Sequence, residues 1–278
     1  MIIGSGSGGV LRMRDGSRCI SWQISIRLEA VIDTSVRASY LTDMSDNWQS
    51  SGRASAAGPR LEVLSAHALR LWVRDSGHRI GAEPFVLVST LPQRTYNRAA
   101  DLGCGSGIIP LLLGKSGRAA EIWGIELEEE DAVLAERNVA GNAMTGKITI
   151  RRGHVRKAAA ALTRGSFDLL TCNPPFFPFD AENGEHSPAT HEVAGTLKEF
   201  LASAAQLAKK DALLAIVYHP SRLLELLATL PVFRFGPARL IGVHPARGKP
   251  ASFAIVHAIA NALPRFDIRP PVFLDEEL

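Results

Sequence analysis

One short stretch of the chain combines an amide, two prolines and an aromatic ring: Asn173, Pro174, Pro175 and Phe176. It follows residues 167–171, a short apolar run between turn-forming residues, which predicts a buried parallel strand. Open α/β sheets bind their ligands outside the carboxyl ends of such strands. Each proline lacks an N–H and has a restricted φ, so the loop cannot extend the strand and keeps one shape. We therefore expect a rigid loop that holds Asn173 in a binding site.

The chemistry that suits this loop is recognition of an amino group on a planar ring. The Asn173 amide oxygen and the Pro174 carbonyl oxygen can both accept hydrogen bonds from an NH2 group. Phe176 offers a face on which a planar ring can stack. Standing alone, the same stretch would be interpreted as an ordinary loop with an asparagine cap and two core phenylalanines, Phe176 and Phe177. The interpretation therefore depends on the rest of the sequence.

A glycine-rich segment, Asp101–Gly107, lies between a predicted strand and a predicted helix that starts at Ile108. Glycines here permit positive φ and a close approach of a ligand to the backbone. The segment is not a phosphate loop, because Ile108 replaces the third glycine of the dinucleotide pattern and no Gly-Lys-Ser/Thr follows. The Asp101 carboxylate would also repel a phosphate, so a cationic or zwitterionic ligand fits better. The candidate ligand contacts are Asp101, Gly103, Cys104, Gly105 and Gly107.

A carboxylate, Glu126, ends the next predicted strand, residues 122–125. It follows the glycine segment by about 20 residues, the separation at which nucleoside-binding α/β proteins place a carboxylate on the ribose hydroxyls. The acidic residues that follow, 128–131, fit the first turn of a helix, where negative charge is favourable. We therefore expect Glu126 alone of this acidic run to bind the ligand.

The elements that position these residues alternate between strand and helix. Strands are predicted at 99–102, 122–125, 148–150, 167–171, 212–218 and 251–258, and helices from Ile108, Asp131, Leu197 and Ser221. Alternation of this kind predicts an α/β fold with a doubly wound, mostly parallel sheet. The spacing of the last two strands suggests an antiparallel edge strand. Lys209 and Lys210 are expected at the end of the Leu197 helix, where positive charge is favourable.

Composition limits the classes of protein. With 46% hydrophobic and 21% charged residues the chain has the make-up of a globular protein. No apolar stretch approaches the ~20 residues that cross a bilayer, and the first residues lack a signal-peptide core. Cys19, Cys104 and Cys172 show no metal-ligand spacing. We expect a cytoplasmic protein with no membrane or metal partner. A formal charge of +3 permits a nucleic-acid partner without requiring one.

The D-x-G-x-G-x-G segment, Glu126 and the N-P-P-F loop together resemble the class I S-adenosylmethionine-dependent methyltransferases, which have a Rossmann-like fold. Within that class, N-P-P-[FY] is shared by enzymes that methylate adenine N6, guanine N2 or glutamine N5. The flanking sequences are similar to those of bacterial tRNA(Val) adenine-37 N6-methyltransferases. They are residues 80–83, 191–192, 218–223, 243–245 and 270–275.

This resemblance implies S-adenosyl-L-methionine as the cofactor. It also implies a catalytic loop, Asn173 to Phe176, in which Asn173 and Pro174 hold the two protons of an exocyclic amine and Phe176 stacks on the base; Asn173 contacts the cofactor as well. The family often has an acidic residue for the cofactor's adenine where this chain has His154. It usually has aspartate where Glu83 stands here. Both positions depart from the family pattern.

The expected partner is RNA, most specifically tRNA, bound by a monomer or weak dimer. Candidate phosphate contacts are Arg151, Arg152, Arg156, Lys157 and Arg164, with Arg222, Arg234, Arg239, Arg247 and Lys249 in the C-terminal half. Three alternatives stay open: a guanine-N2 methyltransferase of ribosomal RNA, a protein glutamine-N5 methyltransferase and a non-catalytic RNA-binding protein. The methyltransferase domain is expected at 61–278. Residues 1–60 are expected to be an N-terminal extension that is poorly ordered or artefactual; within it, residues 24–30 alternate like a strand.

Overall fold

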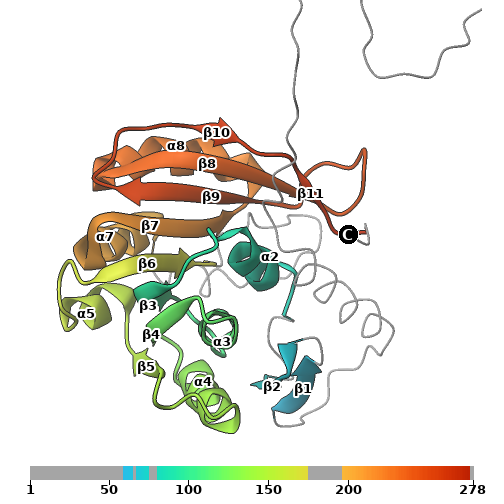
Figure 1. Cartoon of the computed structure of the whole chain (residues 1–278), viewed down its shortest axis with the longest axis vertical. Coiled ribbons are helices and arrows are strands. Elements are labelled where there is room, and N and C mark those ends of the chain that lie inside the picture. The colour runs from blue at the N-terminus through green and yellow to red at the C-terminus, as the bar shows by residue number, and fades with distance from the viewer. Residues whose placement is uncertain (1–58, 65–66, 75–79, 175–195, 276–278) are drawn as a thin grey trace, which may run out of the picture. The chain divides into compact units, whose positions relative to one another are not determined.

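The computed structural model describes residues 59–64, 67–74, 80–174 and 196–275 (Figure 1). The expected N-terminal extension, including the strand at 24–30, lies outside these residues except for positions 59 and 60. Pro175, Phe176 and residues 191–192 also lie outside them. The described structure therefore covers most of the expected methyltransferase domain.

The strands are β1 (Arg60–Leu64), β2 (Leu69–Val73), β3 (Tyr96–Leu102), β4 (Ala119–Glu126), β5 (Ile148–Arg152), β6 (Phe167–Cys172), β7 (Ala208–Tyr218), β8 (Phe235–His244), β9 (Phe253–Ala260), β10 (Asp267–Ile268) and β11 (Val272–Phe273). The helices are α2 (Glu83–Thr90), α3 (Ile108–Lys115), α4 (Glu129–Gly141), α5 (Val155–Ala160), α7 (Leu197–Leu207) and α8 (Leu223–Thr229). Two short 3-10 helices, η2 (Pro220–Arg222) and η3 (Leu230–Phe233), flank α8. The predicted helix at 221–230 is thus one α-helical segment between two tighter turns.

The large sheet has the order β10-β8-β9-β7-β6-β3-β4-β5, and β11 also pairs with β8. Strands β3 to β7 are parallel to their neighbours within this series, whereas β9 is antiparallel to both β7 and β8 (Figure 1). The predicted doubly wound sheet is confirmed. Its antiparallel strand, β9, lies between two neighbours and not at the edge. Chain order reverses between β3 and β6, which places the ligand crevice of such a sheet beside these two strands.

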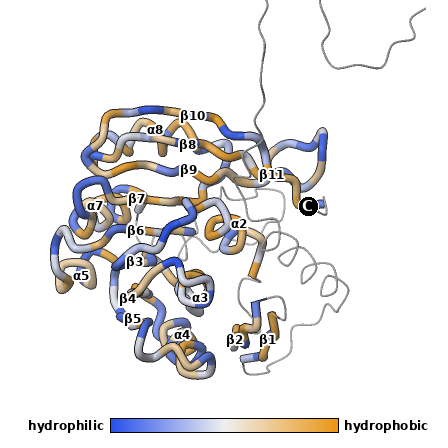
Figure 2. The backbone as a smooth tube through the Cα atoms, in the orientation of Figure 1, coloured by the Kyte–Doolittle hydropathy of each residue, from blue (hydrophilic) through white to orange (hydrophobic). Residues whose placement is uncertain are grey.

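The parallel strands carry apolar side chains on both faces because helices cover both faces. Consecutive residues alternate between two clusters: Leu169 and Leu213 belong to one, and Leu170 and Leu214 to the other. Helices α2 and α3 cover the first face, and α5 and α7 cover the second. Figure 2 shows α2 and β9 as hydrophobic along much of their length. This double coverage explains why the core strands have near-continuous apolar sequences.

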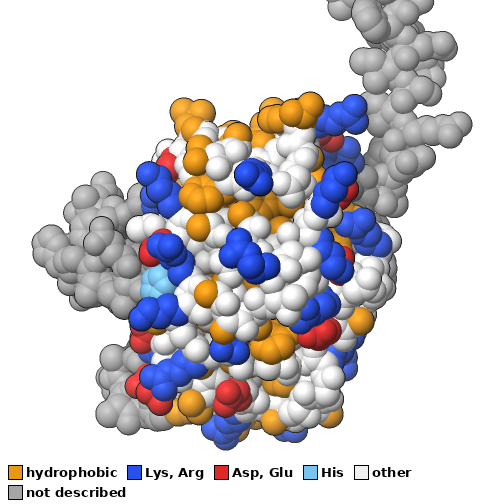
Figure 3. All heavy atoms as spheres, turned by 90° about the vertical axis from the view of Figure 1, so that its left-hand side faces the viewer, with side chains coloured by type: hydrophobic (Ala, Val, Ile, Leu, Met, Phe, Trp, Pro, Cys, Tyr) orange, Lys and Arg blue, Asp and Glu red, His pale blue; other side chains and the backbone are white. Residues whose placement is uncertain are grey.

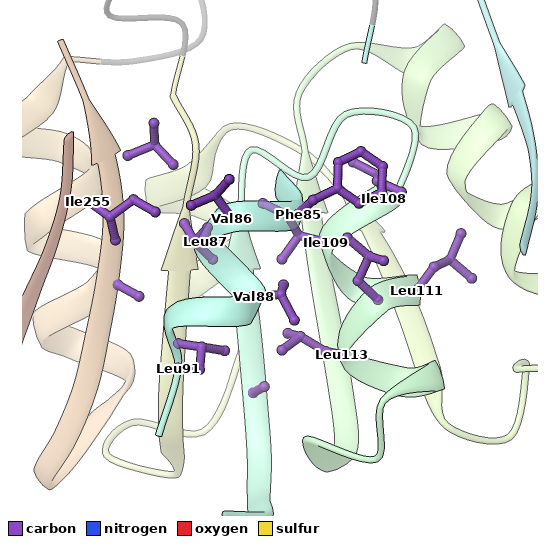
Figure 4. Close-up of a cluster of buried hydrophobic side chains, with 14 of the residues drawn as sticks. Phe85, Val86, Leu87, Val88, Leu91, Ile108, Ile109, Leu111, Leu113 and Ile255 are labelled. Atoms are coloured by element: carbon purple, nitrogen blue, oxygen red, sulfur yellow. The ribbon is translucent and has the colours of Figure 1, made fainter. Parts of the chain in front are cut away.

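Helix α2 fills the space between α3 and the sheet. Seven of its eight residues are buried, and Figure 4 shows Phe85 and Val88 beside the α3 side chains and Leu87 toward Ile255 of β9. Pro84 lies in the first turn, where proline is well tolerated because its N–H would have no partner within the helix.

The prediction for Lys209 and Lys210 is wrong. Helix α7 ends at Leu207 and β7 begins at the next residue, so both lysines lie on the strand. The Lys209 ammonium is 2.8 Å from the Asp168 carboxylate on the neighbouring strand β6. A cross-strand ion pair, not the end of a helix, therefore holds Lys209.

A separate antiparallel hairpin, β1 and β2, precedes the sheet in sequence and contacts α4. The pairing runs from Arg60 opposite Val73 to Leu64 opposite Leu69. No helix within the described ranges is both long and apolar enough to cross a membrane.

Candidate functional site

The candidate site lies at the carboxyl ends of β3, β4 and β6. Strands β3 and β6 are paired so that Asp101 is opposite Thr171 and Leu102 is opposite Cys172. Asn173 therefore emerges from the sheet beside the start of the glycine segment. The structure places Asp101, Glu126 and Asn173 at the carboxyl ends of three neighbouring strands, next to the reversal point of the sheet.

The glycine segment turns sharply between β3 and α3. Gly103, Gly105 and Gly107 have φ values of +78°, +54° and +87°, which a residue with a Cβ rarely adopts. The Gly103 and Cys104 N–H groups both donate to the Ile125 carbonyl, at 2.8 and 2.9 Å, which ties the loop to β4. A Cβ on Gly105 would meet no atom within 4 Å among the described residues. The Gly105 backbone thus faces space that a ligand can enter.

Glu126 supports the same loop from the end of β4. One carboxylate oxygen, Oε2, accepts the Gly105 N–H at 2.7 Å, and Oε1 accepts the Glu128 N–H at 2.9 Å. Burial raises the pKa of this carboxyl, and the two backbone donors oppose that rise. An ionised carboxylate has about four acceptor positions, so lone pairs remain for two ribose hydroxyls.

Asp101 is fully buried under the loop. Its Oδ1 accepts the Thr171 hydroxyl at 2.6 Å, whereas its Oδ2 has no hydrogen-bond partner in the described part of the chain. Burial raises the pKa of Asp101 to about 8, an effect that the Thr171 hydrogen bond opposes and the Glu126 charge reinforces. A buried acceptor without a donor is costly. The residue fits a ligand that brings an ammonium group, and this observation supports a cationic or zwitterionic cofactor.

Asn173 has a second acceptor of this kind. Its Oδ1 is buried and has no hydrogen-bond partner among the residues that the structure describes. Pro174 next to it is buried. Pro175 and Phe176, the other predicted members of the catalytic loop, lie outside the described residues. Asp101 and Asn173 thus place two acceptors without a donor in the described part of the chain at the ends of adjacent strands.

His154 follows β5 and caps helix α5. Its Nδ1 accepts the Arg156 N–H at 3.4 Å, and its Nε2 is 4.0 Å from a carboxylate oxygen of Glu199 on α7. The Glu199 carboxylate therefore lies near His154, the position at which the family often has an acidic residue, although Glu199 belongs to α7. Thr196 and Glu199 form a capping box at the start of α7, the helix that the sequence predicted from Leu197.

Three further residues at the site had no signal in the sequence. The Thr171 hydroxyl donates to Asp101, as described above. The Phe200 ring lies against the glycine loop, since a Cβ on Gly103 would be 3.3 Å from it. The Asn138 side chain donates to the Ser106 carbonyl at 2.9 Å. All three come from elements distant in sequence from the loop.

No group of three metal-ligating side chains suited to a cation is present within the described ranges.

Six of the predicted phosphate contacts lie at one or the other end of the parallel strands. Arg151, Arg152, Arg156 and Lys157 lie at the carboxyl end of β5 and on α5, on the side of the candidate site; Arg152 is paired with Glu129 at 2.7 Å. Arg164 and Arg234 precede β6 and β8, at the amino ends of these strands. Figure 3 views that opposite end, where Lys and Arg side chains outnumber Asp and Glu. The carboxyl-end group is called the cationic rim below.

The strand order, the glycine loop and the carboxylate at the end of β4 have the arrangement of the class I methyltransferase fold, and they form the candidate site. A solved structure from Agrobacterium tumefaciens, described as a predicted O-methyltransferase, has the same fold with a TM-score of 0.53 and 23% identity, covering 65% of this chain and 81% of that one. The family model for the methyltransferase small domain matches residues 76–227, and the chain belongs to that family. This membership confirms the predicted fold class and S-adenosyl-L-methionine as the cofactor.

Curated relatives share one name. A tRNA1(Val) (adenine(37)-N6)-methyltransferase of Porphyromonas gingivalis is 29% identical over 147 residues, which cover 51% of this chain and 58% of that protein. A namesake in Pedobacter heparinus is 23% identical over 180 residues, covering 64% of this chain and 76% of that protein. The chain thus spans less than two thirds of the length of the first of these relatives.

Proposed function

We propose that the protein transfers a methyl group from S-adenosyl-L-methionine to the exocyclic amine of a nucleobase in RNA, most specifically N6 of adenine in tRNA. The observation that carries the proposal is the buried Asn173 Oδ1, which lacks a donor among the described residues and lies beside the cofactor loop. The name shared by the curated relatives supports adenine in tRNA over guanine in ribosomal RNA. A tRNA-modifying enzyme would work in the cytoplasm.

In this proposal the cofactor contacts are Asp101, Gly103, Cys104, Gly105, Gly107, Glu126, His154 and Asn173. Asp101 Oδ2 accepts from the cofactor's ammonium group, and Glu126 accepts from the ribose hydroxyls through its remaining lone pairs. The bound cofactor supplies an electrophilic methyl group. The fit rests on the Asp101 oxygen, which has no donor among the described residues, and on the space above Gly105, which no described residue fills.

The catalytic loop orients the amine. Asn173 Oδ1 and the Pro174 carbonyl oxygen each accept a hydrogen bond from one N–H of the amine, which favours a pyramidal nitrogen whose lone pair is free to attack. Orientation of this kind can supply much of the reduction in barrier. As the N–C bond forms and the bond between sulfur and the methyl carbon breaks, the amine proton becomes acidic and would pass to water, so no strong base is required. Pro175 is assigned to the rigidity of the loop, and Phe176 to stacking on the base.

Methyl transfer from labelled S-adenosyl-L-methionine to bacterial RNA that lacks its own modifications tests the proposal. Nucleoside mass spectrometry should find N6-methyladenosine in the tRNA fraction. N2-methylguanosine in ribosomal RNA would replace the adenine assignment with the guanine one. Label in protein would indicate glutamine methylation, and cofactor binding without label in any acceptor would favour a non-catalytic role.

The cationic rim should bind the RNA backbone. Replacing Arg156 and Lys157, both exposed on α5, with alanine should weaken RNA binding and make it less dependent on salt. Two lost phosphate contacts lower the slope of log K against log salt by about 1.4, at ~0.7 per contact for a single strand. Filter binding between low and high salt measures this slope.

The matched control is Lys210→Ala with Arg265→Ala, an equal change of charge at two exposed residues by the amino ends of β7 and β8. This control should leave the slope unchanged. An equal loss of slope in both double variants would show that the cations act through net charge alone, and the assignment of the rim would be withdrawn.

A further inference from the structure

The hairpin β1–β2 lies outside the segment that matches the family model, yet Asn138 of α4 and Asn142, the C-cap of α4, bind its backbone. Asn138 Oδ1 accepts the Trp72 N–H at 2.6 Å, and its Nδ2 donates to the Trp72 carbonyl at 2.9 Å. Asn142 repeats the pattern with Arg70, at 3.0 and 2.7 Å. The two side chains therefore pair with the edge of β2 that faces away from β1.

The spacing of these residues makes the pairing possible. Residues four apart on a helix lie on one face, about 6 Å apart. Residues two apart on a strand present their N–H and C=O groups along one edge, at about 6.6 Å. The spacing of the two asparagines thus matches the spacing of the backbone groups along β2. Their side chains pair with backbone groups that an edge strand would otherwise leave unpaired. Arg74, just after β2, adds an ion pair with Asp131 of α4 at 2.9 Å.

The two asparagines differ in one respect. Asn138 is fully buried, and its Nδ2 also donates to the Ser106 carbonyl in the glycine loop at 2.9 Å. The additional bond of Asn142 goes to the Asn138 carbonyl, within α4 itself. Asn138 alone of the pair therefore connects the hairpin to the loop.

The glycine loop also packs closely against α4. A Cβ on Gly107 would lie 3.2 Å from the Ala135 Cβ, one turn before Asn138. Ser106 stands between Gly105, whose N–H binds Glu126, and Gly107. A shift of the Ser106 carbonyl would thus move the Gly105 backbone that faces the ligand space.

We propose that Asn138 is a positioning residue through which docking of the hairpin fixes the glycine loop in its cofactor-binding shape. Asn138 touches no part of the cofactor; it acts through Ser106. The proposal rests on the cofactor assignment and is independent of which RNA is methylated. Because coupling between sites is reciprocal, cofactor binding should in turn strengthen docking of the hairpin.

The first test compares Asn138→Ala with Asn142→Ala in the full-length protein. Each variant removes one pair of bonds to β2, but only the first removes the bond to the loop. Calorimetry with S-adenosylhomocysteine as the probe should show about five- to tenfold weaker binding for Asn138→Ala, the effect of one lost hydrogen bond to a buried group. Asn142→Ala loosens the hairpin but keeps the bond between Asn138 and Ser106, so it should weaken binding less, by about two- to threefold. In turnover assays, KM for the cofactor should rise while kcat at saturation changes little.

A second measurement needs no variant and so stands even if Asn138→Ala does not fold. Hydrogen exchange of the β2 amides in the wild-type protein should slow when S-adenosylhomocysteine is added, whereas amides of the distant β8–β9 pair should change little. Unchanged exchange in β2 despite saturating probe would overturn the coupling, as would equal affinities in the two variants.

These outcomes distinguish a failure of the proposed coupling from a failure of the cofactor assignment on which it rests. If wild-type protein binds S-adenosylhomocysteine and Asn138→Ala binds it equally well, the coupling is wrong and the cofactor assignment stands. If wild-type protein fails to bind the probe, the cofactor roles proposed for this chain are wrong and the coupling fails with them. RNA is absent from both experiments, so the choice between adenine and guanine does not affect either result.

Discussion

Replacing Asn173 with alanine should lower kcat by about 10²- to 10³-fold, the usual effect of removing one preorganised polar contact from a transition state. Asn173 Oδ1 is a buried acceptor without a donor among the described residues, so the proposed amine is the group that satisfies it. The variant leaves the amine free to rotate and its lone pair delocalised into the ring. Single-turnover methylation of tRNA measures the rate of the chemical step directly.

Cofactor affinity supplies the control for this variant. Calorimetry should find S-adenosylhomocysteine bound within about threefold of wild type, because the principal proposed cofactor contacts lie on β3, β4 and their loops. Asn97→Ala, the same substitution at an exposed position of β3, should leave both the rate and the affinity unchanged. Normal turnover by Asn173→Ala would remove this residue from the site.

The central strands and the glycine loop could be predicted because their signals are local. Buried parallel strands require continuous apolar runs, and the sharp turn after β3 requires glycines at positions of positive φ. Strand β8 escaped prediction because Gly236 and Pro237 break its pattern, although β9 pairs with it along its length. Pairing of this kind is a tertiary effect that overrides local propensity.

The supporting residues of the site could not be predicted, because their roles depend on contacts between distant segments. Thr171 lies 70 positions after the Asp101 carboxylate to which it donates. Asn138 lies 66 positions from Trp72 and looks like an ordinary polar residue within a helix. A buried asparagine has a recognisable function only when its partners are known. The sequence therefore predicted the residues proposed to touch the cofactor better than those that hold them in place.

Affinity for S-adenosylhomocysteine should rise about tenfold per pH unit between pH 6 and pH 7 and level off only above pH 8, because the pKa of Asp101 is about 8 in the free protein. Below that pH the buried carboxyl is mostly protonated, and it must lose its proton to pair with the ammonium group of the ligand. Calorimetry at pH 7 in buffers of different ionisation enthalpy should detect close to one proton released per ligand bound.

The raised pKa of Asp101 also determines how the stability of the free protein changes with pH. The folded pKa exceeds the ordinary value of 3.8, so the folded free protein holds this proton more tightly than the unfolded chain does. The contribution of Asp101 to the free energy of unfolding therefore falls as pH rises from about 4 to about 8. Ligand should offset that fall, and the increase in Tm on adding S-adenosylhomocysteine should be larger at pH 8 than at pH 6.

Asp101→Asn identifies the titrating group. Asparagine keeps the oxygen that accepts from Thr171 but cannot ionise, so binding should be weaker and nearly independent of pH over this range. Asp211→Asn, the same change at an exposed residue with φ of +62°, should keep the wild-type profile, since asparagine tolerates this conformation. A pH profile that survives in Asp101→Asn would assign the proton to another group, with Glu126 the first to examine because burial raises its pKa as well.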